Sequence, residues 1–508
     1  MFTIVQNFLH KFSSQLHLTL PFIIFSIFLY KWLFYTKKTT PPSPPKLPIL
    51  GNLHQLGRHP HHSLKTLSDR YGSLMLIHLG QKPTLIVSSS HMAKLIMKTH
   101  DSICSNRPKS RVFDKLIYDS RDVASAPYGE YWRQMKSVFV LHLSSVKMVN
   151  SFRVIREEEV SYLVKKIKQN VLSEINLSEL FMRLTNDVVC RAAFGRKYSG
   201  NNRNSMDFIN VLHEFVELLG TFDVSDFIPW MSWVNRVSGF NRKMDNVAEK
   251  FDMILEEIVS EHIKNIGNYK EGENLTKDFV DVLLEVQRES SSGFHIGRDS
   301  IKALILDAFA AGTDTTYTVL EWTMTELLRH PRVMKQLQEE IRGITKHQDD
   351  ISEDDLHKMY YLKAVIKETL RLHPPVPLLL PHESIKQFEI NGYQIAPKTQ
   401  IIINASAIQR DPEIWDEPKE FKPERFFNCS IDYKGHDFEL IPFGGGRRVC
   451  PGILFAMVIN ELVVAKLVNE FNWSLPNEVR VESLDMSEST GLTMHRKTPL
   501  LVVATPRM

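Results

Sequence analysis

The chain has 508 residues, 43% of them hydrophobic, and its formal net charge is +3 at pH 7. This length permits a large core, and the mild charge gives no support for nucleic-acid binding. Four cysteines are too few and too scattered for a disulfide framework, which favours a reducing compartment, and the sequence has no paired CxxC zinc motif.

Residues 1–38 are predicted to form an N-terminal membrane anchor. Residues 12–30 contain no Lys, Arg, Asp or Glu, and residues 32–35 extend the apolar run with aromatic side chains typical of a membrane interface. A span needs about 20 residues. The alternative is a cleaved signal peptide, but bulky residues continue to Tyr35 and no small-x-small cleavage site follows. The basic pair Lys37-Lys38 favours a single-pass anchor whose downstream chain lies in the cytosol.

Residues 39–50 are predicted to be a proline-rich hinge. The run PPSPPKLP at 41–48 has the composition of a stiff polyproline linker, although a disordered spacer would have a similar composition. Beyond it no internal repeat and no domain break is visible. We therefore expect one domain over 51–508, with the polar stretches 201–205 and 285–297 as surface loops.

The pattern beyond the hinge is mainly helical. Strands are expected at 73–79 and 84–87, at 400–404, and in a hairpin at 388–395 whose turn is Asn391-Gly392. The sequence thus predicts a mainly α fold with small β-sheets assembled from distant segments.

A long helical pattern at about 299–328 contains the unusual run AGTDTT at 311–316. Glycine and consecutive polar residues are poor helix formers, and a hydroxyl can bond back to a carbonyl one turn earlier and open the helix. Asp314 and Thr315 would place an acid beside an alcohol, a pair able to relay protons. The alternative is a helix kink with solvated threonines.

The most informative stretch is PFGGGRRVCPG at 442–452. Its glycines permit a tight turn close to a flat ligand, and Cys450 stands just before an apolar helical run at 453–459. The helix N-terminus favours a thiolate there, and thiolates bind iron. A buried cysteine beside a glycine-rich loop is the alternative, which we keep for the other three, Cys104, Cys190 and Cys429.

The spacing around Cys450 resembles the haem signature of the cytochrome P450 haem-thiolate monooxygenases at Phe443, Gly446, Arg448, Cys450 and Gly452. The run at 311–316 is similar to the oxygen-binding helix of that family at every position. The motif YGEYWR at 128–133 and the proline after Cys450 are similar to the plant microsomal branch that includes the family-71 enzymes. These motifs follow the family order, so the resemblance covers essentially the whole chain.

The resemblance implies a cytochrome P450 fold preceded by a single transmembrane helix, and it implies roles for particular residues. Asp314 and Thr315 would be catalytic, and Cys450 would ligate the iron of haem b. The remaining haem contacts would be Arg448, Phe443, Gly446, Trp132, Lys136 and His382. The buried structural triad would be Glu368, Arg371 and Arg425.

Two implied haem contacts depart from the family pattern. Lys136 stands where the family has arginine, and His382 stands where close plant relatives usually have arginine, so pairing with a propionate would be weaker or pH-dependent. Resemblance and helical spacing together give the candidate substrate pocket, formed by Phe113, Leu116, Asp307, Ala310, Ala311, Val376, Leu380 and Leu492.

The function implied is a monooxygenase of the endoplasmic reticulum membrane, facing the cytosol. It would insert one oxygen atom from O₂ into a lipophilic plant specialised metabolite such as a terpenoid, alkaloid or phenolic. Electrons would come from NADPH through a separate reductase, since the sequence shows no GxGxxG motif. Basic residues such as Arg447 would help that partner dock, or would serve solubility alone.

Two rival functions are compatible with the same scaffold. One is a haem enzyme without oxygen chemistry, such as an aldoxime dehydratase or an isomerase, which would not require the Asp314–Thr315 pair. The other is a non-catalytic haem sensor or membrane-bound interaction protein. Consumption of NADPH with reductase, with and without substrates, separates the three.

Overall fold

The computed structural model describes residue 26 and residues 39–197, 203–265, 277–289, 296–345, 351–476 and 479–507. The predicted anchor, apart from residue 26, lies outside these residues. Within them, no single helix has the length and hydropathy to cross a membrane; only the joined segments Glu130–Ser151 and Arg153–Lys168, bent by 61°, meet that test together.

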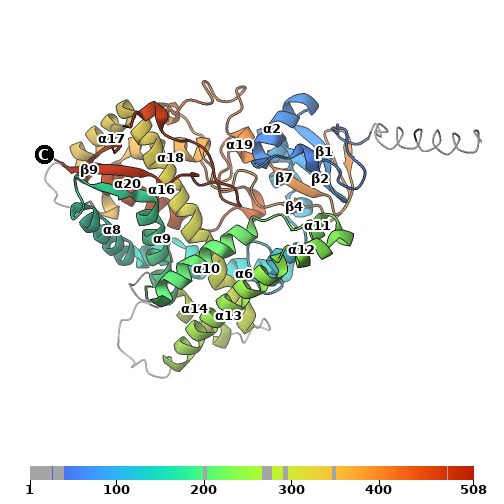
Figure 1. The fold of residues 1–508 in the computed structure, drawn as a ribbon, viewed down its shortest axis with the longest axis horizontal. Coiled ribbons are helices and arrows are strands. Elements are labelled where there is room, and N and C mark those ends of the chain that lie inside the picture. Colours follow the sequence, from blue (N-terminus) through green and yellow to red (C-terminus); the bar gives the residue numbers. More distant parts are fainter. Residues whose placement is uncertain are drawn as a thin grey trace, which may run out of the picture.

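Helices dominate the described chain (Figure 1). The longer ones are α2 (Pro60–Tyr71), α8 (Arg153–Lys168), α9 (Leu177–Phe194), α10 (Arg203–Leu219), α13 (Phe240–Asn265), α14 (Phe279–Glu289), α16 (Gly312–Arg329), α17 (Pro331–Ile344), α18 (Tyr360–Leu372) and α20 (Ile453–Glu470). The shorter ones are α3 (Ser90–Lys94), α4 (Asp101–Cys104), α5 (Arg111–Leu116), α6 (Glu130–Phe139), α7 (Val146–Ser151), α11 (Val224–Phe227), α12 (Trp233–Val237), α15 (Arg298–Leu306) and α19 (Ala405–Ile408).

Tighter and wider turns connect or interrupt these helices. The π-helical turns are η2 (Leu95–Thr99), η3 (Val140–Ser144) and η6 (Asp307–Ala311). The 3₁₀ turns are η1 (Leu53–Gln55), η4 (Pro229–Met231), η7 (Glu353–Lys358), η8 (Pro423–Phe426), η9 (Gly446–Arg448) and η10 (Val481–Ser483).

Helix α16 is the centre of the core, because it packs against α9, α18 and α20. Most of α20 is apolar on every side, and most of its residues from Met457 to Asn469 are buried accordingly. Helix α17 is amphipathic instead: it buries Val333, Met334, Leu337 and Ile341 at helical spacing and exposes its charged face. The cysteine loop is therefore attached to a buried helix, α20, that packs directly against α16.

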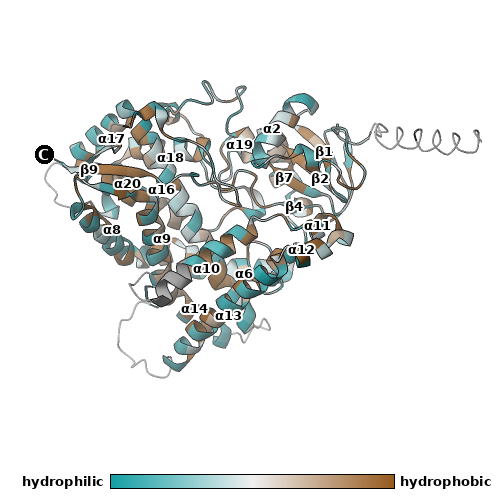
Figure 2. Cartoon of the chain, in the orientation of Figure 1, coloured by the Kyte–Doolittle hydropathy of each residue, from teal (hydrophilic) through white to brown (hydrophobic). Residues whose placement is uncertain are grey.

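Three small sheets lie beside the helices. The first has the order β1-β2-β7-β4, the second β3-β9-β8 and the third β5-β6. Among the strands of the described residues, only β2 and β7 pair in parallel, with Thr84 opposite Gln400. In Figure 2, β2 and β7 are largely hydrophobic, while α13 carries both colours along its length. The bounds are β1 (Leu74–Leu79), β2 (Lys82–Val87), β3 (Glu174–Asn176), β4 (His382–Glu383), β5 (Phe388–Ile390), β6 (Tyr393–Ile395), β7 (Gln400–Ile403), β8 (Phe471–Ser474) and β9 (Leu501–Pro506).

The strand predictions are confirmed, including the hairpin. Asn391 and Gly392 both have positive φ, 48° and 77°, as a two-residue turn matching the strand twist requires. The predicted loops are partly wrong: α10 begins at Arg203, and α14 continues to Glu289 because its apolar face packs against α9 and α15. Residues 201–202 and 290–295 of those stretches lie outside the described residues.

The proline-rich segment is attached to the sheets. The carbonyl of Pro42 accepts from Leu76 N at 2.9 Å in β1, and the carbonyl of Thr39 accepts from Gln394 N at 2.8 Å in β6. The buried Asn52 amide donates to the carbonyl of Pro45 at 3.2 Å. These contacts fix the direction in which the chain enters the domain.

Candidate functional site

The loop before α20 holds Cys450 in a closed turn. Its backbone N–H donates to the carbonyl of Phe443 at 3.0 Å, which closes the glycine loop onto itself. Gly446 has φ +63°, and a Cβ there would lie 2.1 Å from the carbonyl oxygen of Met97. Glycine is needed at Gly446 for contact with η2, whereas Gly444, Gly445 and Gly452 of this loop line the cavity beside Cys450.

Two effects act in opposite directions on the Cys450 thiol. Burial raises its pKa, whereas the Gly452 backbone N–H and the Lys136 ammonium lower it. The backbone N–H at the start of α20 lowers the Cys450 pKa, as the sequence predicts. The effect of burial is larger, so the net shift of this pKa is upward. A metal ion bound there would deprotonate the thiol outright.

A cavity of about 280 Å³ brings the cysteine loop and the central helix together. The loop contributes Phe443 and Cys450 to its wall, and α16 contributes Gly312 and Thr315. Most of the remaining lining is apolar, with residues from η3, α9 and the segment after α18. The fold therefore places a sulfur donor and a hydroxyl, 135 residues apart in sequence, in the wall of one apolar space.

Three basic side chains line the same cavity, namely Arg107, Lys136 and Arg448. Burial lowers the pKa of Arg107 to about 10, and burial together with the charge of Arg107 lowers the pKa of Arg448 to about 9. Positive charge in an apolar space is costly unless an anion shares it. A flat apolar group with two carboxylates complements this wall, so the residues present fit haem b.

Arg107 and Arg448 each have N–H groups left over that can donate to such an anion. Three of the five N–H groups of Arg448 donate to the carbonyls of Ser105, Val123 and Ala126, at 2.8, 3.1 and 2.6 Å. Arg107 likewise uses three, donating to Ala124, Leu380 and Pro381 at 2.8, 2.7 and 2.8 Å. Two N–H groups on each remain without a partner among the described residues. Sequence analysis missed Arg107, because a single arginine in a loop carries no spacing signal.

The other predicted haem contacts also lie at this cavity. The Trp132 indole donates to Val123 O at 3.0 Å and lies under the Arg448 guanidinium, 4.1 Å from its ring centroid. The Lys136 ammonium bonds to the carbonyl of Arg447. His382 lines the cavity fully buried, with Nδ1 2.9 Å from the carbonyl of Cys104.

The expected pH-dependence at His382 is corrected by its surroundings. Burial and the neighbouring Arg107 lower its pKa to about 3. The imidazole is therefore neutral across the physiological range, with Nδ1–H donated to the carbonyl and Nε2 as an acceptor. A neutral ring contributes a polar contact to this wall rather than a titrating cation.

The helix predicted at about 299–328 is interrupted about one turn before the middle of the AGTDTT run. The π-helical turn η6 separates α15 from α16, and the Thr315 hydroxyl bonds back to the carbonyl of Ala311 at 2.7 Å. Thr315 lines the cavity, whereas Asp314 does not and lies 14% exposed on another face. The acid and the alcohol are adjacent in sequence but face different surroundings.

Asp314 belongs to a polar network that sequence analysis missed. The Thr493 hydroxyl donates to its carboxylate, and His495 Nε2 lies 4.0 Å from its second oxygen. The other nitrogen of His495 lies 2.9 Å from the Thr318 hydroxyl, one turn after Asp314. These partners come from the C-terminal segment, about 180 residues away, and no local pattern indicates them.

The structure brings most of the predicted pocket residues together. Asp307, Ala311, Val376 and Leu380 line the cavity of Cys450. Phe113 and Leu492 line a second cavity of about 340 Å³, which shares Val376, Leu380 and three further wall residues with the first.

Two predicted pocket residues line neither cavity. Leu116 is buried against α10 and α13 at the end of α5. Ala310 is buried outside the cavity. The π-helical turn rotates the side chains of residues 307–311 relative to a regular α-helix, and Ala308 therefore lines the cavity where Ala310 was expected.

Asp307 differs from an ordinary carboxylate. Its pKa is raised well above the usual range by burial and by the charge of Asp122. Its Oδ2 accepts from the backbone N–H of Val123 at 2.6 Å and of Ala124 at 3.3 Å. The Asp307 carboxyl thus lies in the cavity wall and fixes the loop segment whose carbonyls accept from Arg107 and Arg448.

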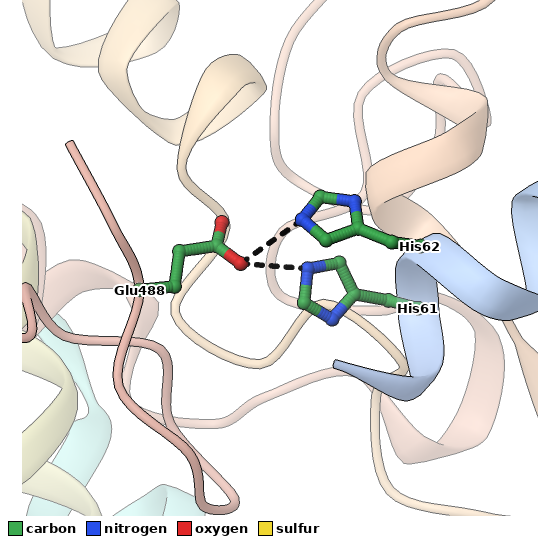
Figure 3. Close-up of side chains that lie close together, drawn as sticks. All are labelled: His61, His62 and Glu488. Carbon is green, nitrogen blue, oxygen red and sulfur yellow. Dashed lines mark hydrogen bonds and ion pairs between the residues drawn. The ribbon is translucent and has the colours of Figure 1, made fainter. Parts of the chain in front are cut away.

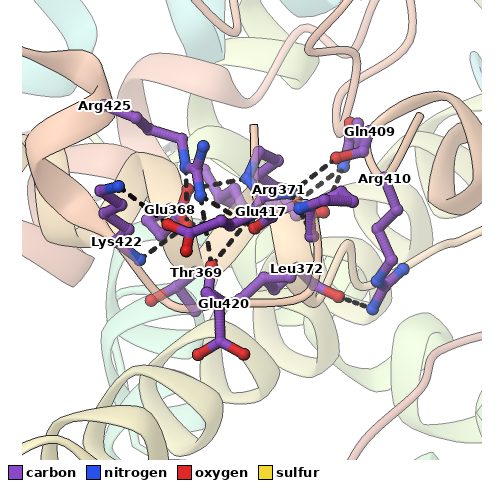
Figure 4. Close-up of polar contacts among 12 residues, drawn as sticks. Glu368, Thr369, Arg371, Leu372, Gln409, Arg410, Glu417, Glu420, Lys422 and Arg425 are labelled. Atoms are coloured by element: carbon purple, nitrogen blue, oxygen red, sulfur yellow. Dashed lines mark hydrogen bonds and ion pairs between the residues drawn. The ribbon is translucent and has the colours of Figure 1, made fainter. Parts of the chain in front are cut away.

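The predicted Glu-Arg-Arg triad is assembled between α18 and the segment that contains η8 (Figure 4). Glu368 accepts from Arg371 Nε at 2.7 Å and from Arg425 Nε at 3.0 Å, and its side chain is fully buried. Arg371 also donates to the carbonyls of Gln409 and Pro418, at 2.9 and 2.8 Å. The buried charges are paired and bonded, as burial requires.

Comparison with known proteins agrees with this geometry. The sequence model described as Cytochrome P450 matches residues 41–503. Cytochrome P450 736A117 of Prunus mume is 56% identical over 492 residues, 95% of this chain and 94% of the relative. Cytochrome P450 71A26 of Arabidopsis thaliana is 50% identical (92% of this chain, 94% of the relative), and norfluorocurarine oxidase of Strychnos is 47% identical (96% and 98%). A zebrafish cytochrome P450 solved with progesterone superposes with a TM-score of 0.77 at 26% identity, covering 88% of this chain and 99% of that one.

Proposed function

The chain belongs to the cytochrome P450 family of haem monooxygenases, and on that premise we propose that it oxygenates a lipophilic plant specialised metabolite in the pocket above Cys450. The observation that carries the proposal is the single apolar cavity that holds Cys450, Thr315 and the Arg107–Arg448 pair in its wall. Haem b, with electrons from NAD(P)H through a reductase, supplies oxygen activation when bound.

The residues of this chain divide the work of holding the haem. Cys450 is the proposed iron ligand, and the glycines beside it leave room for a flat ring. The unused N–H groups of Arg107 and Arg448 are the proposed donors to the propionates, with Lys136 supplying a further positive charge. Trp132 fixes the Arg448 guanidinium by lying against it.

Asp314 and Thr315 are the proposed proton donors. The Thr315 hydroxyl, which lines the cavity, donates its one proton to the carbonyl of Ala311, so delivering that proton into the cavity requires the hydroxyl to rotate away from this bond. Asp314 lies on another face of the helix, where it accepts from the buried Thr493 hydroxyl and lies near His495, whose side chain is 16% exposed and gives the proposed route from solvent. General acid assistance of this kind contributes about 10²–10⁴ in rate.

The substrate proposed is a terpenoid, alkaloid or phenolic. The mostly apolar lining of both cavities supports a lipophilic skeleton, and the Asp307 carboxyl is a polar group in the wall of the first. One relative, 47% identical over 501 residues, is named norfluorocurarine oxidase, and this supports including alkaloids among the candidates.

The proposed setting is the endoplasmic reticulum membrane, with residues 1–38 as a single-pass anchor, residues 39–50 as a hinge and residues 51–508 facing the cytosol. The proposed partner is the NADPH-dependent reductase, docking on the side of the cysteine loop. Arg447 is half exposed there, and its Nε lies 3.2 Å from Asp101 Oδ2. Because Asp101 partly neutralises this charge, Arg447 attracts an acidic partner less strongly than an unpaired arginine would.

The experiment uses full-length protein with reductase in membranes. We expect a red-shifted ferrous–CO band that Cys450→Ala abolishes, and a screen of plant metabolites should find compounds that both shift the Soret band and give oxygenated products. Retention of the CO band in Cys450→Ala would remove the assigned ligand. Turnover without NADPH would favour the isomerase or dehydratase alternative.

A further inference from the structure

A cluster of three imidazoles and one carboxylate lies outside the wall of the Cys450 cavity. Figure 3 shows three of these side chains, His61, His62 and Glu488. His61 and His62 stand in the first turn of α2, His59 directly precedes that helix, and Glu488 comes from the C-terminal segment. Oε2 of Glu488 lies 2.9 Å from His61 Nε2, 3.3 Å from His62 Nε2 and 4.0 Å from His59 Nδ1. Four possible ligand atoms therefore converge from two distant parts of the chain.

The hydrogen bonds of this cluster are incomplete. The His61 side chain is 1% exposed, and its Nδ1 has no hydrogen-bond partner among the described residues. The Nδ1 atom of His59, on the side nearest Glu488, is also buried without a partner in that part of the chain. All three imidazole contacts of this carboxylate involve the same oxygen, Oε2 of Glu488.

The spacing suits a tetrahedral ion. With metal–ligand bonds of about 2.0–2.1 Å, neighbouring ligand atoms are about 3.3 Å apart. The separations of 2.9, 3.3 and 4.0 Å from Glu488 Oε2 lie on either side of that value. His61 Nε2, His62 Nε2 and the carboxylate also lie within 4.8 Å of one another.

We propose that His61, His62 and Glu488 bind one divalent transition-metal ion of the zinc class, with His59 or water as the fourth ligand. Imidazole nitrogens with one carboxylate suit Zn²⁺ and Ni²⁺ better than Mg²⁺ or Ca²⁺, which prefer oxygen ligands only. The site lacks thiolates, and the positive charge of Arg410 acts on both His61 and Glu488. Its affinity is therefore below that of structural sites with several cysteines.

Such an ion would connect α2 to the C-terminal segment at the wall of the second cavity. His61 lines that cavity, and so do Gly491, Leu492 and Met494, which follow Glu488 within six residues. The ion would restrain both sides of this wall at once. The proposal is independent of the haem chemistry, because the ligands lie outside the wall of the Cys450 cavity.

The test uses full-length, haem-loaded protein without a polyhistidine tag, treated with a chelator and dialysed against Zn²⁺. We expect one equivalent of zinc per chain and a zinc-dependent rise in the unfolding temperature. His62→Ala and Glu488→Gln should each weaken binding at least tenfold and remove that rise. His436→Ala, which removes an exposed histidine elsewhere, should change neither.

Folding is checked by the ferrous–CO band of each variant. His62 is the decisive position, since its side chain is 61% exposed and its removal leaves the core intact. If wild-type protein binds no zinc at 100 µM (about the strength of a weak site), or if His62→Ala binds it as tightly as His436→Ala, the proposal is wrong. Binding that falls equally in all three variants would also overturn it.

Discussion

Replacing Glu368 with glutamine should destabilise the protein severely. The carboxylate accepts from Arg371 at 2.7 and 2.8 Å, from Arg425 at 3.0 Å and from Lys422 N at 2.9 Å. Glutamine keeps the shape but removes the negative charge that pairs with both guanidinium groups, and it turns an N–H₂ toward one of them. Side-chain exposures of 0% for Glu368 and Arg371 and 8% for Arg425 leave no solvent screening.

The cost follows from this geometry. Breaking a buried ion pair by removing one partner costs about 3–5 kcal/mol of the free energy of unfolding, because the remaining charge is stranded. The matched control is Glu424→Gln on the adjacent turn η8, whose partner Arg332 is 67% exposed at 2.7 Å. Exposed pairs contribute about 0–1 kcal/mol.

The assay is urea unfolding of the haem-loaded protein, followed by Soret and far-ultraviolet circular dichroism. The double variant Glu368→Gln/Arg425→Gln should lose less than the sum of its single variants, because the second change removes one stranded charge. If Glu368→Gln and Glu424→Gln differ by less than about 1 kcal/mol, the argument for a charge triad is refuted.

Three further predictions follow from other parts of the molecule. Thr315→Ala should retain haem and substrate binding but release hydrogen peroxide at the expense of product, and unchanged product per NADPH would contradict its role in proton delivery. Arg107→Ala should weaken haem retention, measured by transfer to apomyoglobin, whereas Arg447→Ala, at a half-exposed position, should not; equal retention in both variants would remove Arg107 from the haem site. Burial raises the pKa of Glu461 to about 7, so the folded state binds this proton more tightly than the unfolded state, and stability falls as pH rises from about 4.5 through 7. Glu461→Gln should therefore stabilise the protein at pH 8 by up to about 3 kcal/mol and have little effect at pH 5, and an equal effect at both pH values would contradict the assignment.

The sequence alone determined the features that depend on local spacing. Cys450 with its glycines, the AGTDTT run and the Asn391-Gly392 turn each place their chemistry within a few neighbouring residues, so the pattern predicts them. The family, the mainly α class and the strand positions followed from the same local signals. The pairing of Glu368 with Arg371 was visible because the two stand three apart on one helix.

Only the tertiary structure decided the contacts between residues distant in sequence and the direction in which individual side chains point. Arg107 reaches the cavity only because its loop folds beneath Arg448, and Thr493 meets Asp314 only because the C-terminal segment returns to α16. The π-turn at Asp307–Ala311 moved Ala310 out of the wall, since one extra residue in a turn changes every facing around it. Burial then set the protonation of His382 and Asp307, because desolvation depends on the packed surroundings and not on the residue type.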